Sequence, residues 1–211
     1  MVTSPGSARR SDPGYAFDFC GGQPAIDFTN TVGSRGGEPE EHLRTFGDVI
    51  AWAEARRLLG RADAARLRRR AARRPAAARA AMAQALVLRE ALYRVIAAVA
   101  AGHQAPDEDL AIVNGHLRDT LSRLRLTPTR GGLALTAPGD HDALGAPIFG
   151  SVARAAADLL TSGAIGRVRA CADPGCAWLF LDTTRSGTRR WCTMQSCGNR
   201  AKVRRFRQAD A

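Results

Sequence analysis

Four cysteines near the C-terminal end constrain the fold of this chain more than any other feature. They form two pairs, Cys171-x4-Cys176 and Cys192-x4-Cys197, joined by an insert of fifteen residues. Each short loop lets two thiolates point to one centre, and the insert brings the second pair round to complete a tetrahedral set. We therefore expect one structural zinc ion held by all four cysteines.

Other uses of four cysteines fit this chain less well. Disulfide bonds are disfavoured because the chain shows no export signal. An iron–sulfur cluster accepts four thiolates, but with other spacings, and a redox pair more naturally has the CxxC spacing. A catalytic zinc keeps an open coordination position, so four cysteine ligands predict a structural metal.

The residues around the cysteines predict a small treble-clef-like module over 167–211. A tight turn over 173–175 lies between the first two cysteines, and 168–170 with 178–181 form a predicted β-hairpin. Residues 196–208 are expected to form a short helix that carries the second pair at its start. So short a segment has too little core to fold alone, and zinc ligation, worth on the order of 10 kcal/mol in small fingers, would supply the missing stability.

The predicted C-terminal helix has an apolar side. Val203 and Phe206 lie three residues apart, so both face the same side of a helix. We expect this side to pack inward against Trp178 and Phe180. Asn199 is well placed to cap the N-terminus of the helix.

Positive charge is concentrated in the same module. The chain has 31 Lys and Arg against 20 Asp and Glu, a net charge of +11, and the segment 167–211 holds ten of the basic residues with three acids. Such an excess predicts an anionic partner, with nucleic acid first. The predicted contacts are Arg185, Arg189, Arg190, Arg200, Lys202, Arg204, Arg205 and Arg207.

The arginine excess of this segment and the role of Trp191 each have an alternative interpretation. Lys202 is the only lysine, so a coding bias toward arginine could create a solvated basic face with no partner. Against that, no acid lies between Asp182 and Asp210. Hydroxyls, glycine and arginines over 183–190 suit phosphate oxygens. Trp191 covers the metal site in the interpretation we favour, or stacks on a base.

The sequence before residue 167 predicts a mainly helical domain over 15–162, after a flexible tail over 1–14. Helices are expected over 43–59, 61–74, 76–101, from 107 onward and over 147–161, with a short β-hairpin formed by 124–127 and 133–136. The fold class is therefore mainly α, with the small zinc module added at the end.

Candidate sites in the helical domain are weaker. Asp27, Asn30 and Thr31 could line a small-molecule pocket, although helix capping or turn hydrogen bonds explain them equally well. The arginine run over 66–74 fits a solvated helix face better than a second nucleic-acid site. Cys20 is expected to be a buried small apolar residue. No nucleophile–base pair, metal-ligand cluster or phosphate loop precedes residue 167, so we expect no enzyme.

Motifs in both parts of the chain resemble a known family. Trp178–Asp182, Arg189–Cys192 and above all Cys197–Arg200, with the sequence CGNR, resemble the CGNR zinc finger. Upstream, Ile26–Thr31 leading into the 43–59 segment resembles the ABATE domain that accompanies this finger in bacterial proteins. The family is described as stress-induced transcription regulators, so the resemblance implies a bacterial protein with a DNA-binding finger.

We therefore expect a DNA-binding transcription regulator whose helical domain senses a signal or mediates assembly. Two alternatives stay open: an RNA-binding or ribosome-associated protein, and an interaction adaptor whose basic stripe meets an acidic protein. The expected partners are DNA or RNA and an unidentified small-molecule effector, and a homo-oligomer fits the sequence equally well. No apolar run approaches the roughly 20 residues that span a bilayer, so a cytoplasmic location is expected.

Overall fold

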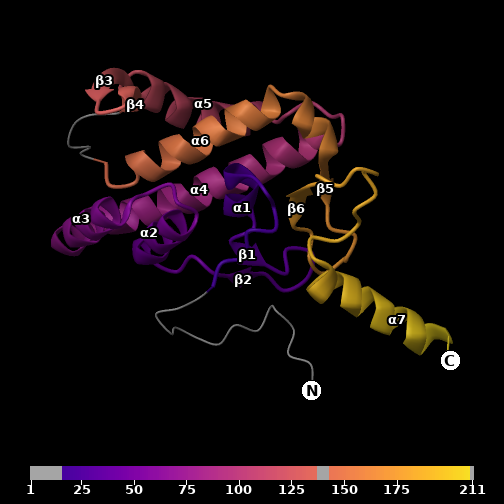
Figure 1. Cartoon of the computed structure of the whole chain (residues 1–211). Helices are drawn as coiled ribbons and strands as arrows, with labels where there is room; N and C mark the ends of the chain where they lie inside the picture. The colour runs from indigo at the N-terminus through magenta and orange to yellow at the C-terminus, as the bar shows by residue number, and fades with distance from the viewer. Residues whose placement is uncertain (1–15, 137–142, 210–211) are drawn as a thin grey trace.

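The computed structural model describes residues 16–136 and 143–209 (Figure 1). The tail predicted over 1–14 lies outside these residues. In chain order the elements are α1 (Pro24–Thr29), β1 (Val32–Gly33), β2 (Glu40–Glu41), α2 (Phe46–Ala55), α3 (Arg61–Arg73), α4 (Pro75–Ala100), α5 (Asp107–Leu121), β3 (Arg125–Thr129), β4 (Gly132–Thr136), α6 (Ala146–Leu160), the 3-10 helix η1 (Gly163–Arg167), β5 (Val168–Ala170), β6 (Leu179–Leu181), the π-turn η2 (Met194–Gly198) and α7 (Asn199–Ala209).

The long helix α4 organises the fold. Pro75 starts it, at a position where a missing backbone donor costs nothing, and alanine-rich turns extend it with little loss of side-chain entropy. Leu88, Leu92 and Ile96 on its inner face are fully buried. Around this face lie α1, α2, α5 and α6, while α3 packs at one end and β5 at the other (Figure 1). The mainly helical fold predicted from the sequence is confirmed.

The helix predicted over 43–59 begins later, at Phe46. Thr45 and Asp48 form a capping box, in which each side chain accepts a hydrogen bond from the other residue's backbone N–H. Leu43 lies before the cap but is still fully buried, because the chain entering the helix packs on the core. The predicted hairpin forms as β3 and β4, with Leu126 opposite Leu135.

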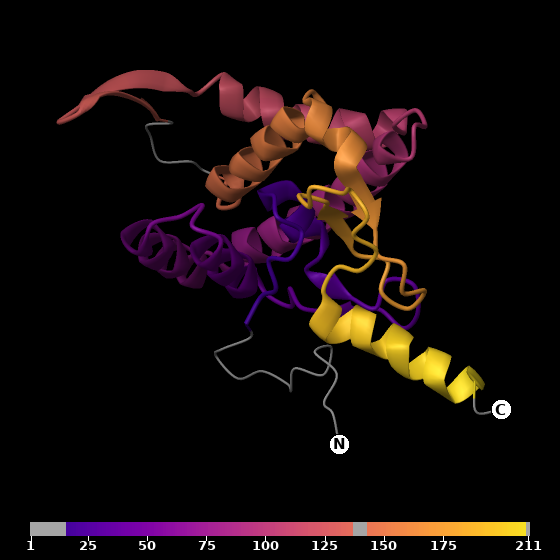
Figure 2. The same cartoon turned by 45° about the vertical axis from the view of Figure 1, so that its right-hand side comes forward.

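One hydrophobic core joins the helical part to the C-terminal part. Phe28 and Trp52 lie at its centre, with ring centroids 4.9 Å apart. Val168 of β5 and Leu179 of β6 are buried in the same cluster. Figure 2 shows the β5–β6 hairpin against the body of the molecule, whereas α7 stands out from it. No helix in the described part of the chain is long and apolar enough to cross a membrane.

Candidate metal centre and basic surface

The first cysteine pair lies where the β5–β6 hairpin ends. The backbone N–H of Cys171 donates to the carbonyl of Trp178 at 2.7 Å. This hydrogen bond continues the strand pairing up to the loop between Cys171 and Cys176. The N–H of Cys176 donates to the carbonyl of Asp173 at 2.9 Å and closes the predicted tight turn. Both thiols therefore face the same side of the hairpin.

The second pair reaches the same point through the π-turn η2. Thr193 caps this turn, since its hydroxyl accepts from the N–H of Ser196. The expectation that Asn199 is the N-cap is wrong, because the helical path has already begun at Met194 and the Asn199 amide donates back to the carbonyl of Gln195. A Cβ at Gly198 would lie 2.7 Å from the sulfur of Met194, so a larger residue there would have to push the Met194 side chain aside.

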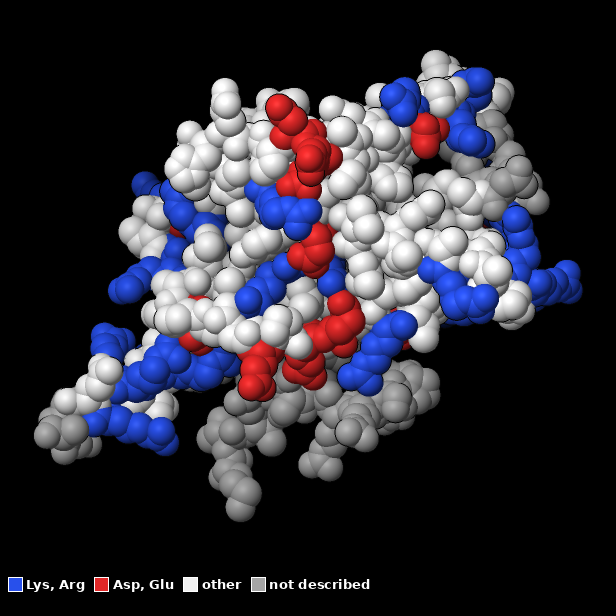
Figure 3. Space-filling view, turned by 180° about the vertical axis from the view of Figure 1, so that it is seen from behind, with Lys and Arg blue, Asp and Glu red and all other residues white. Residues whose placement is uncertain are grey.

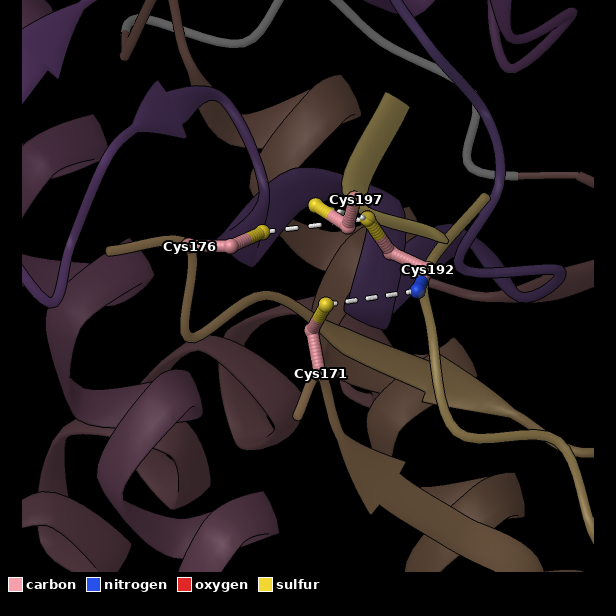
Figure 4. Close-up of side chains that lie close together, drawn as sticks. All are labelled: Cys171, Cys176, Cys192 and Cys197. Atoms are coloured by element: carbon pink, nitrogen blue, oxygen red, sulfur yellow. Dashed lines mark hydrogen bonds between the residues drawn. The ribbon is translucent and has the colours of Figure 1, made fainter. Parts of the chain in front are cut away.

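Four sulfur atoms converge on one point (Figure 4). All four Sγ atoms, from Cys171, Cys176, Cys192 and Cys197, lie within 4.8 Å of one another and all four residues are buried. The Sγ of Cys192 is 3.7 Å from that of Cys176 and 3.4 Å from that of Cys197. Zinc bound tetrahedrally at about 2.3 Å separates its sulfur ligands by about 3.8 Å, so the cluster has the dimensions of a zinc site.

The electrostatics of the cluster call for a cation. Hydrogen bonds to the neighbouring sulfur atoms, that to Cys171 first, together with burial raise the pKa of the Cys192 thiol, so ionising this thiol costs free energy. Zn²⁺ removes this penalty and binds all four as thiolates. The protein holds one structural zinc ion at these cysteines, as the sequence predicted.

Arg200 and Asp173 support the metal site from outside. The Nη2 of Arg200 donates to the Sγ of Cys197 at 2.8 Å, and its Nε donates to the Asp173 carboxylate at 2.7 Å. Burial raises the pKa of Asp173, but the hydrogen bond and charge of Arg200 outweigh this effect and leave that pKa below its usual value. Arg200 therefore orients a zinc ligand rather than pointing to solvent with the other predicted contacts.

The rest of α7 is exposed. Lys202, Arg205 and Arg207 face solvent, while Arg204 is half-exposed and lies 3.2 Å from Asp173. The expectation that Val203 and Phe206 pack inward is wrong, because they are 49% and 72% exposed. The helix leaves the module after its first turn, so nothing in the described chain covers this apolar side.

The loop between β6 and Cys192 has one inward and two outward arginines. The Arg189 guanidinium donates to carbonyls of Cys20, Leu181, Trp191 and Cys192 and lies 4.3 Å from the centre of the Phe180 ring. Arg189 is thus used within the protein, whereas Arg185 and Arg190 are exposed.

Two residues that are not zinc ligands lie against the metal site. Trp191 packs on the cysteine cluster, as expected of a residue that covers the metal. Cys20, from the other end of the chain, packs on the same cluster and is half-buried rather than buried. Sequence spacing could not reveal this contact, since 150 residues lie between Cys20 and Cys171.

Asp27, Asn30 and Thr31 have structural partners. The Nε of Arg56 donates to the Asp27 carboxylate at 2.8 Å, the Asn30 amide bonds to the backbone of Leu179, and the Thr31 hydroxyl donates to the carbonyl of Phe28. Of the two interpretations of these residues, the geometry supports local and long-range hydrogen bonding rather than a pocket.

The helical part and the four-cysteine metal module share one hydrophobic core. This is the architecture of a zinc-finger protein with an N-terminal helical domain. Residues 22–163 match the ABATE family, described as "Putative stress-induced transcription regulator", and residues 167–209 match the CGNR zinc finger. The chain belongs to the ABATE family, as its resemblance predicted. A search of curated proteins found no match to the chain.

Proposed function

We propose that this protein is a DNA-binding transcription regulator that uses α7 and the adjoining loop to hold DNA. One observation carries the proposal: α7 projects from the body with Lys202, Arg205 and Arg207 exposed and no acidic residue along its length. In Figure 3, basic side chains gather at the end of the molecule that α7 forms and also at the opposite end, and acidic side chains run down the middle of the same face. The acidic stripe would keep a polyanion away from the middle of this face.

The dimensions of α7 suit a DNA groove. Its eleven residues give a length of about 16 Å at a rise of 1.5 Å per residue. A major groove about 12 Å wide admits an α-helix. Arg200 and the zinc site fix the base of α7 to the module, so the helix would meet the groove in one orientation. The first contacts would be with phosphates, which position a protein without reading sequence.

A shallow hollow of about 600 Å³ at the base of α7 offers further phosphate contacts. Hydroxyls of Thr184, Ser186 and Thr188 line it together with Arg190 and Trp191. The Asp182 carboxylate accepts from the N–H groups of Thr184 and Arg189 and so holds the loop in shape. This arrangement supports the proposal that the loop holds phosphate oxygens.

The helical domain would act in sensing or assembly rather than in catalysis, and the protein would act in the cytoplasm on DNA. The ABATE family description supports regulation. Within the described residues, the Cys171–Cys197 cluster is the only group of three or more potential metal ligands found together, and its four cysteines leave no open position for a catalytic metal.

Salt-dependent binding tests this proposal. Zinc-loaded protein should bind a random duplex, and Lys202→Ala, Arg205→Ala and Arg207→Ala should each flatten the plot of log affinity against log salt by about 0.9, because each lost phosphate contact releases one counterion fewer. Arg118→Ala, an exposed arginine on α5, is the matched control. Wild-type binding by all three variants would refute the proposal, and tighter binding to a structured RNA of equal length would favour an RNA-binding protein.

The exposed side chains of Val203 and Phe206 favour a second candidate, an adaptor that binds an acidic protein through α7. Such a partner would cover the apolar side while its carboxylates met the arginines. A complex of this kind survives nuclease treatment and is lost in Phe206→Ala, whereas phosphate binding in a groove tolerates this change.

A further inference from the structure

A fifth sulfur atom lies against the metal centre. Cys20, which precedes α1, packs on the cluster formed by Cys171, Cys176, Cys192 and Cys197. We propose that Cys20 is a modification site for hydroperoxides: its oxidised sulfur forms a disulfide with Cys192 and so removes one ligand from the zinc ion. This site acts on the metal centre and does not depend on DNA binding.

The backbone around Cys20 is held close to that of Cys192. The carbonyl of Gly21 accepts from the N–H of Leu181 at 2.9 Å, which ties the segment to β6. One nitrogen of Arg189, Nη2, donates to the carbonyl of Cys20 at 3.1 Å and also to the carbonyl of Cys192. A disulfide needs Cα atoms about 4.4–6.8 Å apart, and two backbones bridged by a single nitrogen are close enough to form one.

Of the five sulfur atoms, that of Cys20 is the most accessible. The four zinc ligands are buried, whereas Cys20 is half-buried. The hollow of about 600 Å³ at the base of α7 is lined by Cys20 and Cys192 and by none of the other three cysteines. A hydrogen bond with the Cys20 thiol is also among the effects that raise the pKa of the Cys192 thiol, so these two side chains are in contact. A small oxidant that enters the hollow therefore meets this pair first.

The chemistry needs one hydroperoxide and two thiols. The sulfur of Cys20 attacks an oxygen of the hydroperoxide, so that an S–O bond forms, the O–O bond breaks and the leaving hydroxide or alkoxide takes up a proton. The product is a sulfenic acid. The thiolate of Cys192 then attacks the Cys20 sulfur, the S–S bond forms, and the hydroxide that leaves takes up a proton to become water. The two sulfur atoms together lose two electrons, which the hydroperoxide accepts.

Loss of Cys192 from the metal site loosens the base of α7. Cys171, Cys176 and Cys197 would remain, one fewer than the four ligands of a structural zinc site, so the zinc ion is released. Arg200, in the first turn of α7, donates to the Sγ of Cys197 at 2.8 Å and loses an acceptor that the metal holds in place. Oxidation of Cys20 would thus free α7 from the module.

Hydrogen peroxide is the probe, added to the zinc-loaded full chain with a chromophoric chelator that reports zinc release. We expect a disulfide between Cys20 and Cys192, identified by peptide mapping after the free thiols are blocked, to form in step with zinc release. Dithiothreitol with added zinc should reverse both changes. Cys20→Ser should release zinc at least about tenfold more slowly, since the accessible sulfur is gone. Met194→Leu removes another oxidisable side chain at the hollow and, as the matched control, should behave like the wild type.

Three results would overturn the proposal. Zinc release from Cys20→Ser at the wild-type rate would mean that the oxidant attacks the ligands directly. A first disulfide between Cys192 and Cys197, whose Sγ atoms are 3.4 Å apart, would mean the same. Oxidation of Cys20 with the zinc retained would show that this thiol does not act on the metal.

Two controls keep these outcomes separate from other failures. Circular dichroism and zinc content before oxidation check that Cys20→Ser is folded, and Cys20→Ala replaces it if it is not. Zinc release and disulfide formation are both measured without DNA, so failure of the proposed function would leave these results unchanged.

Discussion

Asn30 and Leu179 exchange two hydrogen bonds across 149 residues of sequence. The side-chain amide of Asn30 donates to the carbonyl of Leu179 at 2.8 Å and accepts from its N–H at 3.1 Å. Both residues are buried. The Asn30 side chain therefore pairs with β6 as the backbone of a neighbouring strand would. These two hydrogen bonds attach the zinc module to the helical part, close to the Cys171–Cys176 loop.

Asn30→Ala should be strongly destabilising. It leaves the N–H and carbonyl of Leu179 buried without partners, at a cost of about 1–3 kcal/mol for each unsatisfied group. Denaturant unfolding should show a loss of roughly 2–4 kcal/mol in the free energy of unfolding. Asn114→Ala, on the exposed side of α5, serves as control and should differ little from the wild type. An unchanged unfolding midpoint for Asn30→Ala would mean that the two hydrogen bonds between Asn30 and Leu179 contribute nothing to stability.

Zinc removal should destabilise the whole chain, not the module alone. A zinc module with a separate core would unfold without affecting the helical part. In this protein Val168 and Leu179 of the module belong to the core that contains Phe28 and Trp52. The hydroxyl of Tyr93 also donates to the carbonyl of Ala177 in the knuckle at 3.0 Å. Far-ultraviolet dichroism and tryptophan fluorescence should therefore report one shared transition at lower temperature after chelation or in Cys171→Ser. Helical signal that keeps its original midpoint without zinc would contradict this coupling.

Local patterns predicted the parts of the fold that depend on local chemistry. The zinc ligands follow from loop lengths between cysteines, and α4 follows from apolar spacing ended by Gly102. Periodicity also placed Val203 and Phe206 on one side of a helix, but it carries no information about whether another element covers that side. The structure leaves this side exposed because α7 departs from the module.

Long-range contacts were beyond the reach of the sequence. Arg200 and Arg204 have the spacing of an outward basic stripe, yet both approach Asp173, 27 and 31 residues earlier in the chain. Asn30 gains its role only from Leu179.

Arg200→Ala should weaken zinc binding, whereas Arg207→Ala should not. Arg200 donates to a zinc ligand, and without it the Asp173 carboxylate, which is 2% exposed, keeps only the longer contact from Arg204. Loss of such a supporting contact typically costs about 10–100-fold in metal affinity. Zinc transfer to a chromophoric chelator should be faster in Arg200→Ala and unchanged in Arg207→Ala. Equal transfer from both variants would show that the arginine does not act on the metal.

Asp27 should make stability depend on pH in a defined direction. Burial raises its pKa from 3.8 to about 6, and the charge and hydrogen bond of Arg56 offset only part of this effect. Because the folded-state pKa is the higher one, the folded protein holds a proton that the unfolded chain has lost between these two values. The contribution of Asp27 is therefore fully present below about pH 4 and is lost as pH rises through about 6.

Asp27→Asn carries no charge at any pH in this window and isolates the effect. The free energy of unfolding of the wild type, relative to this variant, should fall by on the order of 3 kcal/mol from about pH 4 to about pH 7, at 1.36 kcal/mol for each pKa unit. Denaturant melts across the window measure this difference. Asp158→Asn removes an exposed carboxylate of α6 and is the matched control, for which no fall of this size is expected. A difference between wild type and Asp27→Asn that stays flat with pH would mean that Arg56 holds the Asp27 carboxylate ionised throughout, and that the ion pair outweighs burial.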